Sequence, residues 1–274
     1  MRVLHIISGG DTGGAKTHVF TLLKQLQKEI DVELVCLSDG IFYQEAVAIG
    51  LKVSLIAQKR RMDLSILKTI ADKVNNEKFS IIHCHGARAN FLSFFFRKKV
   101  KVPIITTIHS DYKLDFAHSF YKNMIFTPIN RISLSKMDGY LAVTGIFKRD
   151  LVSRGFQAER IHVIYNGIDI QERSKDYSNI QARNMVLGCA TRLMPIKGTD
   201  VLLKALAVMK EKGYQPILRI AGNGDLKYTD KLKSFVQEND LEEQVAFLGF
   251  VKDMEGFYET IDINILPSYT EGFP

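Results

Sequence analysis

The feature that most constrains the fold of this chain is a repeated alternation of short apolar stretches, rich in Val and Ile, with longer stretches of helical period. The short stretches have the length of strands, and the longer ones place apolar residues three and four positions apart, as amphipathic helices do. Strands that alternate with helices pair in parallel, because each helix carries the chain back to the edge where the previous strand began. The sequence therefore predicts an α/β protein with doubly wound, Rossmann-like parallel sheets.

The alternation divides into two sets, separated by a polar stretch without a clear period. In the first set we expect strands at residues 2–8, 32–37, 53–56, 81–84, 104–108, 140–143 and 161–165, and helices at about 15–28, 44–49, 64–75, 87–97 and 147–154. In the second set we expect strands at residues 185–190, 216–221, 245–248 and 262–266, and helices at about 200–212, 226–239 and 254–260. A chain of 274 residues can bury two cores, so we expect a first domain over residues 1–169, a linker over 170–184 and a second domain over 185–274.

The charge of the chain is uneven along its length. Residues 1–169 carry 24 Lys or Arg against 15 Asp or Glu, a net charge of +9. Residues 170–274 carry 13 against 15, a net charge of −2, and the two values give the +7 of the whole chain. A basic first domain predicts an anionic partner there, either a membrane surface or a polyanion.

The stretch FLSFFFRKKVKV, residues 91–102, joins aromatic and basic residues. It has two interpretations: a core helix with a solvated basic end, or a patch whose aromatic rings rest among the headgroups of an anionic bilayer. Arg60, Arg61, Arg131 and Lys136 could extend such a patch if the fold brings them near.

Cysteine usage and hydropathy bear on the compartment. Cys36, Cys84 and Cys189 lie within predicted strands, so we expect buried free thiols in a reducing cytoplasm. The sequence has no apolar run of transmembrane length, and its first residues resemble a short strand rather than a signal peptide. We therefore expect a cytoplasmic protein, with peripheral contact at the inner face of the plasma membrane if the basic patch binds lipid.

A glycine-rich turn follows the first predicted strand. Gly9, Gly10, Gly13 and Gly14 lie between that strand and the next helix, where free backbone N–H groups could hold an anion. Their spacing does not match G-x-G-x-x-G, so a plain tight turn explains them equally well.

All seven histidines lie within residues 1–169, the expected first domain. His83, His85 and His109 fall at or just after predicted strand ends, where doubly wound sheets bind their ligands. No two histidines have the spacing of an H-E-x-x-H pair or of a Cys/His cluster, so a zinc site is the weaker interpretation and we expect no metal.

The stretch CATRLMPIKGTD, residues 189–200, ends a predicted strand and opens a helix. Arg192 and Lys197 offer a guanidinium fork and a point charge that can clamp two phosphate groups beside the helix N-terminus. The first and fourth strands of such a sheet are neighbours, so the loop after the fourth strand should bring Glu271 to the same crevice. Cations suit a diphosphate and a carboxylate suits sugar hydroxyls.

A series of short motifs gives these observations a family context. The motifs are GGAKTH at residues 13–18, IHS at 108–110, NGID at 166–169, RLMPIKG at 192–198, AGNGDL at 221–226, FLGFV at 247–251 and PSYTEGFP at 267–274. In this order and spacing they resemble the retaining glycosyltransferases of family 4, which have the GT-B fold of two Rossmann-like domains facing a central cleft.

The resemblance implies a role for each matching residue. Gly14 would give a backbone N–H to the distal phosphate, Arg192 and Lys197 would neutralise the diphosphate leaving group, and Glu271 would bind donor-sugar hydroxyls. His109 would contact the transferred sugar near its anomeric carbon, and His18 would belong to the acceptor side. The other donor-binding residues that the resemblance implies are Gly222, Gly249, Val251, Gly272 and Phe273, with residues 249–251 lining the pocket for the base.

The chain departs from the family pattern at its end. The family has a second glutamate eight positions after the first, and that position lies beyond Pro274. We therefore expect an incomplete second domain and no measurable transfer by this polypeptide. The sequence also has no D-x-D motif, so we expect Arg192 and Lys197 to replace a metal ion at the diphosphate, with no cofactor.

The expected function is transfer of a sugar from a nucleoside diphosphate-sugar, most often a UDP- or GDP-sugar, to a glycan or lipid-linked acceptor. The anomeric configuration would be retained, and the setting would be cell-surface polysaccharide synthesis. Two alternatives stay open: a sugar-nucleotide epimerase of the same fold, and an inactive fragment that acts only as a binding module. Nucleic acid is not an expected partner, because no helix-turn-helix, zinc-finger or RNP-like signature is present.

Overall fold

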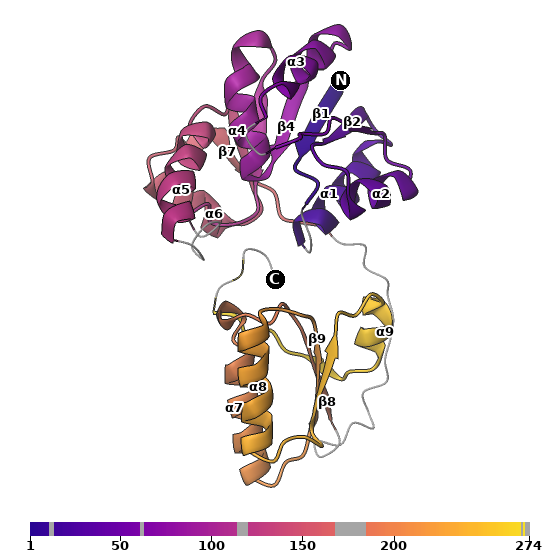
Figure 1. Cartoon of the computed structure of the whole chain (residues 1–274), viewed down its shortest axis with the longest axis vertical. Coiled ribbons are helices and arrows are strands. Elements are labelled where there is room, and N and C mark those ends of the chain that lie inside the picture. Colours follow the sequence, from indigo (N-terminus) through magenta and orange to yellow (C-terminus); the bar gives the residue numbers. More distant parts are fainter. Residues whose placement is uncertain (11–13, 61–62, 114–119, 168–184, 270, 272–274) are drawn as a thin grey trace. The chain divides into compact units, whose positions relative to one another are not determined.

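The computed structural model describes residues 1–10, 14–60, 63–113, 120–167, 185–269 and 271. The chain forms two compact units, Met1–Ile170 and Gln171–Gly272 (Figure 1). Each unit has its own parallel sheet and its own apolar core. The α/β class with doubly wound parallel sheets is therefore confirmed.

The first unit has a seven-stranded sheet in which every pair of neighbours is parallel. In spatial order its strands are β3 (Val53–Leu55), β2 (Asp31–Cys36), β1 (Arg2–Ile7), β4 (Ile81–His85), β5 (Ile104–Ile108), β6 (Gly139–Ala142) and β7 (Ile161–Val163). The strand order reverses between β1 and β4, and ligands of doubly wound sheets bind beyond the carboxyl ends of the strands at such a point.

Two apolar cores hold helices to this sheet. The helices α1 (Gly14–Leu26) and α2 (Ile41–Ala48) pack against β1 and β2. The helices α3 (Ile66–Asn76), α4 (Gly86–Phe96) and α6 (Gly145–Ser153) supply the larger core. The 3₁₀ helices η1 (Arg97–Lys99) and η2 (Ala158–Arg160) follow α4 and precede β7. Cys36 and Cys84 are buried and free, as is Cys189 of the second unit, which confirms the expectation for the thiols.

One helix of the first unit was missed. The helix α5 (Phe120–Leu134) connects β5 to β6, a stretch for which the sequence predicted no element. Pro128 lies inside it, and proline normally ends a helix pattern. Its buried positions among the described side chains are the polar Asn130 and Ser133 besides Leu134, whereas Ile125 and Ile132 are exposed, so it lacks the continuous buried apolar face of a core helix.

The second unit has a four-stranded parallel sheet within its described residues. Its strands in spatial order are β10 (Val245–Gly249), β9 (Ile217–Ala221), β8 (Val186–Ala190) and β11 (Ile263–Asn264). The helices α7 (Thr199–Glu211) and α8 (Leu226–Glu238) lie side by side on one side of this sheet, and α9 (Met254–Glu259) lies on the other (Figure 1). The pairing of β11 with β8 makes the first and fourth strands neighbours, as predicted.

Candidate functional site

The second unit brings Lys197 and Glu271 into contact. The Lys197 Nζ donates a hydrogen bond to Glu271 Oε1 at 2.7 Å, and both side chains are largely shielded from solvent. Lys197 ends the 3₁₀ helix η4 (Pro195–Lys197) after β8, whereas Glu271 follows β11. Two residues predicted for one crevice from strand order alone are thus direct partners.

Backbone contacts hold these two loops together. The Tyr269 amide donates to the Ile196 carbonyl at 3.0 Å. Gly198 has a φ of +66°, and a Cβ at this position would lie 2.2 Å from the Pro267 carbonyl oxygen. Glycine is therefore required here both for the left-handed backbone and for the close approach of the second loop. Gly198 also precedes Thr199, the first residue of α7, so the helix N-terminus opens beside the ion pair.

Arg192 lies in the same β8 loop and is exposed. It has no ion-pair partner within the part of the chain that the structure describes. The guanidinium is thus available to an anion from solvent, whereas the Lys197 ammonium is already engaged by a carboxylate.

The loops after β8, β9 and β10 are joined by backbone hydrogen bonds. The Gly222 amide donates to the Gly249 carbonyl at 2.7 Å, and the Thr191 amide donates to the Ala221 carbonyl at 2.9 Å. The Gly222 amide is therefore used within the protein. A Cβ on Gly222 would lie 1.8 Å from the Thr191 carbonyl oxygen, so this glycine serves the packing of the loops.

The stretch predicted to line the base pocket follows β10. Val251 is half-buried and packs against the small apolar cluster of Ala221, Phe257 and Ile261. Phe250 is 77% exposed, an unusual position for a phenylalanine and a suitable one for stacking on a planar ring.

The structure gives little information on the surroundings of three of the predicted donor-binding residues. Gly272 and Phe273 lie outside the described residues. Gly14 begins α1, and none of the described residues outside its own helix and chain neighbours lies within 4 Å of a Cβ placed on it.

The first unit brings five histidines together beside the point where its strand order reverses. His5 of β1 lies opposite His83 of β4 in register, and His85 follows two residues later on the same face. His18 comes from α1, and His109 directly follows β5. The ring centroids of His18 and His109 are 4.9 Å apart. The two histidines assigned by resemblance to the acceptor and catalytic sides are thus neighbours.

Hydrogen-bond distances link most of this cluster. His5 Nδ1 lies 3.0 Å from His85 Nε2, and His85 Nδ1 lies 3.5 Å from His109 Nε2. His83 Nε2 lies 2.7 Å from Thr107 Oγ1. His5, His85 and His109 therefore form a continuous series of rings from the buried strand β1 to the half-buried His109.

Burial keeps the histidine rings neutral. It lowers the pKa of both His5 and His109 to about 3, with a smaller contribution from the charge of His18. Burial and the neighbouring histidines hold the pKa values of His83 and His85 well below the usual range. Burial also lowers the pKa of His18, although the Asn166 side chain opposes that shift. At neutral pH each ring therefore offers one N–H donor and one lone pair.

The loop that carries His109 is fastened by an ion pair. The Arg154 guanidinium at the end of α6 donates two hydrogen bonds to the Asp111 carboxylate. The guanidinium also lies over the Tyr112 ring, 4.9 Å from its centroid. A bidentate pair fixes orientation as well as distance, so Asp111 and Arg154 position the backbone two residues from His109.

Sequence reasoning missed His5, Thr107, Asp111 and Arg154 as parts of this region. His5 sits inside a strand without any motif, and only the pairing of β1 with β4 places it beside His83. The two-residue period of a strand predicted that His83 and His85 share one face of the sheet. That period does not say which strand lies next to them. The histidines His5, His83 and His85 offer ring nitrogens within 4.8 Å of one another, which is close enough to hold a metal ion.

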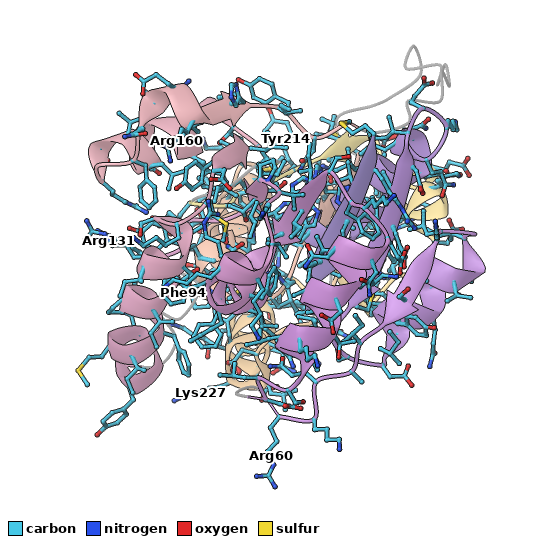
Figure 2. All side chains as sticks on the ribbon, turned by 90° about the horizontal axis from the view of Figure 1, so that it is seen from above. Arg60, Phe94, Arg131, Arg160, Tyr214 and Lys227 are labelled. Atoms are coloured by element: carbon cyan, nitrogen blue, oxygen red, sulfur yellow. The ribbon has the colours of Figure 1, made fainter. Side chains whose placement is uncertain are left out.

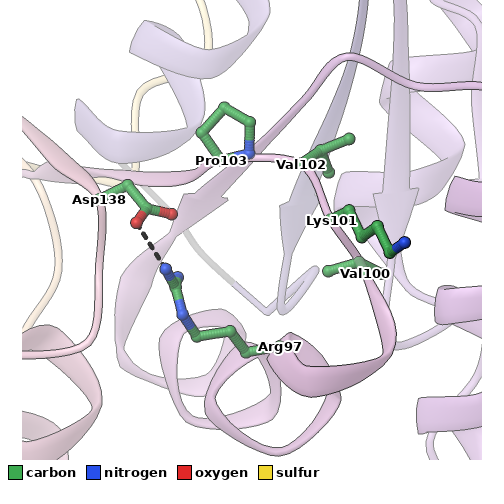
Figure 3. Close-up of a pocket in the computed structure, with 6 residues that line it drawn as sticks. All are labelled: Arg97, Val100, Lys101, Val102, Pro103 and Asp138. Atoms are coloured by element: carbon green, nitrogen blue, oxygen red, sulfur yellow. Dashed lines mark hydrogen bonds and ion pairs between the residues drawn. The ribbon is translucent and has the colours of Figure 1, made fainter.

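A hollow of about 360 Å³ lies elsewhere in the first unit (Figure 3). The residues that line it are Arg97, Val100, Lys101, Val102, Pro103 and Asp138. Pro103 and Asp138 immediately precede β5 and β6, so the hollow lies at the amino ends of the strands, away from His85 and His109. The Arg97–Asp138 ion pair spans it, and we do not include it in the candidate site.

None of the helices in the described ranges combines the length and apolar character needed to cross a bilayer.

Comparison with known proteins gives the family. Residues 12–172 match the sequence profile of Glycosyltransferase Family 4, and residues 170–274 match that of Glycosyl transferases group 1. The O-antigen biosynthesis glycosyltransferase WclY of Escherichia coli is 24% identical over 284 residues, covering 100% of this chain and 75% of WclY. The capsular polysaccharide biosynthesis glycosyltransferase CapH of Staphylococcus aureus is 22% identical over 282 residues, covering 100% of this chain and 77% of CapH.

Solved structures give the same fold. The crystal structure of HepE from Anabaena in complex with UDP and glucose matches with a TM-score of 0.80 at 21% identity, covering 100% of this chain and 76% of HepE. The lipopolysaccharide outer core galactosyltransferase WaaB matches with a TM-score of 0.74 at 18% identity, over 100% of this chain and 76% of WaaB. These neighbours are GT-B glycosyltransferases, which confirms the predicted fold class. The family profile covers more than half of the chain, and the chain therefore belongs to glycosyltransferase family 4.

Proposed function

We propose that this glycosyltransferase moves a sugar from a nucleoside diphosphate-sugar to a glycan or lipid-linked acceptor in cell-surface polysaccharide synthesis, with retention of anomeric configuration. The single observation that carries the donor half is the Lys197–Glu271 contact beside the N-terminus of α7. It brings together the side chain proposed to bind phosphate and the side chain proposed to bind sugar hydroxyls.

The chemistry of the leaving group explains the choice of residues. When the bond between the anomeric carbon and the diphosphate oxygen breaks, negative charge develops on the diphosphate. Preorganised cations stabilise that charge in the transition state, which is the role proposed for Arg192 and Lys197. Glu271 would orient the sugar hydroxyls, and no metal ion would be needed at the phosphates.

His109 and His18 would act on the transferred sugar and on the acceptor. Both rings are neutral at neutral pH, so they can hydrogen-bond to hydroxyls without adding charge. His109 would contact the transferred sugar near its anomeric carbon, and His18 would contact the acceptor. Retention follows only from the family resemblance, and the anomeric proton coupling of an isolated product would test it.

The comparisons support the class of donor and acceptor. HepE has been crystallised with UDP and with UDP-glucose, which favours a UDP-sugar donor over a GDP-sugar here. The names of WclY and CapH place those relatives in O-antigen and capsular polysaccharide synthesis.

Calorimetric titration with UDP, GDP and ADP tests the donor proposal. UDP should bind, and Lys197→Ala should weaken its binding at least about tenfold, because a charge-assisted hydrogen bond contributes about 1.5–3 kcal/mol. Lys204→Ala is the matched control, since Lys204 is an exposed lysine of α7 whose ion-pair partner among the described residues is Asp200. Equal binding by both variants would remove Lys197 from the donor site.

A peripheral contact with an anionic membrane is part of the proposal, because a lipid-linked acceptor lies at such a surface. Exposed apolar side chains on α4 and α5, here called the apolar patch, support it: Phe94, Phe95, Tyr121, Met124, Ile125 and Ile132. The two helices contact each other. Tyr121, Ile125 and Ile132 are spaced by four and seven positions, which puts them on one stripe of α5.

Basic residues border the apolar patch. Lys98, Lys99 and Lys101 are exposed next to α4, and Arg131 is exposed on α5. Phe94 and Arg131 lie on the same side of the unit, whereas Arg60 lies apart from them (Figure 2). Arg97 is engaged by Asp138. Arg61, which the sequence also suggested for this surface, lies outside the described residues.

A further inference from the structure

We propose that His5, His83 and His85 form a binding site for one transition-metal ion, with Zn²⁺ the best-suited common ion. These three buried side chains offer nitrogens within 4.8 Å of one another. Imidazole nitrogen is a preferred ligand of zinc, and three histidines with an open fourth position are an established zinc arrangement in other proteins. The site is separate from the donor diphosphate, for which no metal is proposed.

Strand geometry explains why the three rings converge. Residues two apart on a strand point to the same face, so His83 and His85 are neighbours along β4. His5 lies opposite His83 on the paired strand β1. His5 Nδ1 and His85 Nε2 are 3.0 Å apart, whereas two nitrogens that bind one tetrahedral zinc at about 2.0–2.1 Å lie about 3.3 Å apart. A shift of a few tenths of an ångström would bring this pair to the zinc-binding distance, and the His83 nitrogen lies within 4.8 Å of both.

The outer nitrogens of two of these rings already have partners. His83 Nε2 lies 2.7 Å from Thr107 Oγ1, and His85 Nδ1 lies 3.5 Å from His109 Nε2. Ligand histidines typically use their second nitrogen in this way, which fixes the ring and selects the nitrogen that faces the metal. The arrangement leaves Nδ1 of His83 and Nε2 of His85 for the ion.

The second nitrogen of His5 would not itself contact the ion. His5 Nε2 is buried and has no hydrogen-bond partner among the described residues, whereas Nδ1 is the nitrogen that faces His85. With Nδ1 on the ion, Nε2 would carry the ring proton, and a buried water is the usual partner when the protein supplies none. The described residues of the cluster include no carboxylate, so water or hydroxide would complete the coordination.

The competing account is a stack of hydrogen-bonded imidazoles without an ion, because 3.0 Å also suits an N–H···N hydrogen bond. The half-buried rings of His109 and His18 adjoin the cluster on the side nearer to solvent. The two accounts differ in metal content, so they can be separated by a direct measurement.

The experiment measures zinc in the untagged chain after incubation with ZnCl₂ and desalting. We expect about one zinc per chain and a higher melting temperature with zinc, because an ion that binds only the folded state stabilises it. His83→Ala and His85→Ala should lose the zinc and the shift, whereas His162→Ala should keep both, since His162 is an exposed histidine of β7.

A spectroscopic measurement on the unaltered chain covers the case in which these variants do not fold. Loading with Co²⁺ in place of zinc should give the visible absorption bands of a four-coordinate ion, and added zinc should remove them. The proposal is overturned if the chain retains no zinc, if folded His83→Ala or His85→Ala retains as much as the unaltered chain, or if Co²⁺ gives only the weak spectrum of a six-coordinate aquo ion.

Discussion

Lys197 and Glu271 lie 74 positions apart in the sequence, yet the ammonium donates a 2.7 Å hydrogen bond to the carboxylate. The contact exists because β11 pairs with β8, so that the loops after both strands leave the same edge of the sheet. If Lys197 binds the diphosphate as proposed, the phosphates and the Glu271 carboxylate would compete electrostatically for the ammonium, although its three N–H groups could serve both. We therefore expect the carboxylate to lower the affinity for bare nucleotide at the place where it would hold a donor sugar.

Glu271→Gln should separate these two effects. With the carboxylate charge removed, Lys197 is free for phosphate, and UDP should bind as tightly as before or up to about tenfold more tightly. The affinity for a UDP-sugar relative to that for UDP should fall about tenfold, because the amide is a poorer acceptor for sugar hydroxyls. Calorimetry with UDP and with the UDP-sugar measures the two quantities. A loss of UDP affinity as large as that of Lys197→Ala would contradict the competition.

Phe250 should stack on the nucleotide base. An aromatic ring that is 77% exposed gains burial when a base covers it, and base–aromatic stacking contributes about 1–3 kcal/mol. Phe250→Ala should therefore weaken UDP binding about 5- to 100-fold, whereas Phe250→Tyr should retain most of the affinity. The matched control is Tyr214→Ala, another exposed aromatic of the second unit, and calorimetry is the measurement. Equal affinities for Phe250→Ala and the unaltered chain would rule out stacking.

The sequence was sufficient for the sheets, because each strand is a short apolar stretch and each connection is long enough for a helix. It also placed Lys197 beside Glu271, since strand order follows from the doubly wound class. It could not place His5 beside His83, because that contact depends on the register of two strands that are distant in sequence. The bidentate Asp111–Arg154 pair was missed for a related reason, since one partner lies in a loop and the other at a helix end.

Helix α5 was not predicted from the sequence, and the physical reason is different. Sequence patterns identify helices by their buried apolar face, and α5 buries Asn130 and Ser133 while exposing Ile125 and Ile132. A pattern without a continuous buried apolar face gives the helical period little weight, so the sequence alone does not mark this helix.

Gly224 should not tolerate a larger residue, because the backbone of the neighbouring loop packs directly against it. A Cβ on Gly224 would lie 1.9 Å from the Leu193 carbonyl oxygen, so Gly224→Ala must push apart the loops after β8 and β9. We expect the free energy of unfolding of the second unit to fall by about 2 kcal/mol or more. Gly213→Ala is the control, because Gly213 has a φ of +81° and nothing lies within 4 Å of its Cβ.

Urea unfolding followed by circular dichroism measures both glycine variants. Gly213→Ala carries only the backbone strain of a left-handed residue, about 1 kcal/mol. The packing account fails if Gly224→Ala unfolds at the same urea concentration as Gly213→Ala.

The Asp111–Arg154 pair should make the first unit sensitive to acid. The hydrogen bonds that Arg154 donates to Asp111 hold the pKa of this carboxyl below its ordinary value, so folding is favoured while the carboxylate is charged. This contribution is fully present above the unfolded pKa of about 3.9 and is lost as the pH falls through the lowered folded pKa. Arg154 stays charged throughout.

The comparison of the unaltered chain with Asp111→Asn tests this contribution. The variant should be less stable by about 2 kcal/mol between pH 5 and 8, and the difference should shrink below about pH 4. Thermal unfolding across this pH range is the measurement. A difference that stays constant down to pH 3 would show that the hydrogen bonds do not depend on the charge of Asp111.

The apolar patch on α4 and α5 should bind anionic bilayers. Each apolar side chain that enters the headgroup region gains about 25 cal/mol per Å² of buried surface, and each nearby Lys or Arg adds about 1 kcal/mol. Ile125→Glu removes apolar surface and adds a repelled charge, so retention on vesicles with anionic lipid should fall about tenfold or more. Val208→Glu is the matched control, because Val208 is similarly exposed but lies on α7 of the second unit.

Cosedimentation with vesicles of phosphatidylcholine, with and without phosphatidylglycerol, separates the two contributions to binding. The unaltered chain should bind the anionic vesicles, and high salt should weaken the binding because surface charges are screened beyond about 10 Å at 0.1 M salt. Lys98→Glu should reduce binding only to the anionic vesicles, whereas Ile125→Glu should reduce the part that survives high salt. Equal retention of Ile125→Glu and Val208→Glu would show that α5 exposes its apolar stripe to a partner other than a membrane.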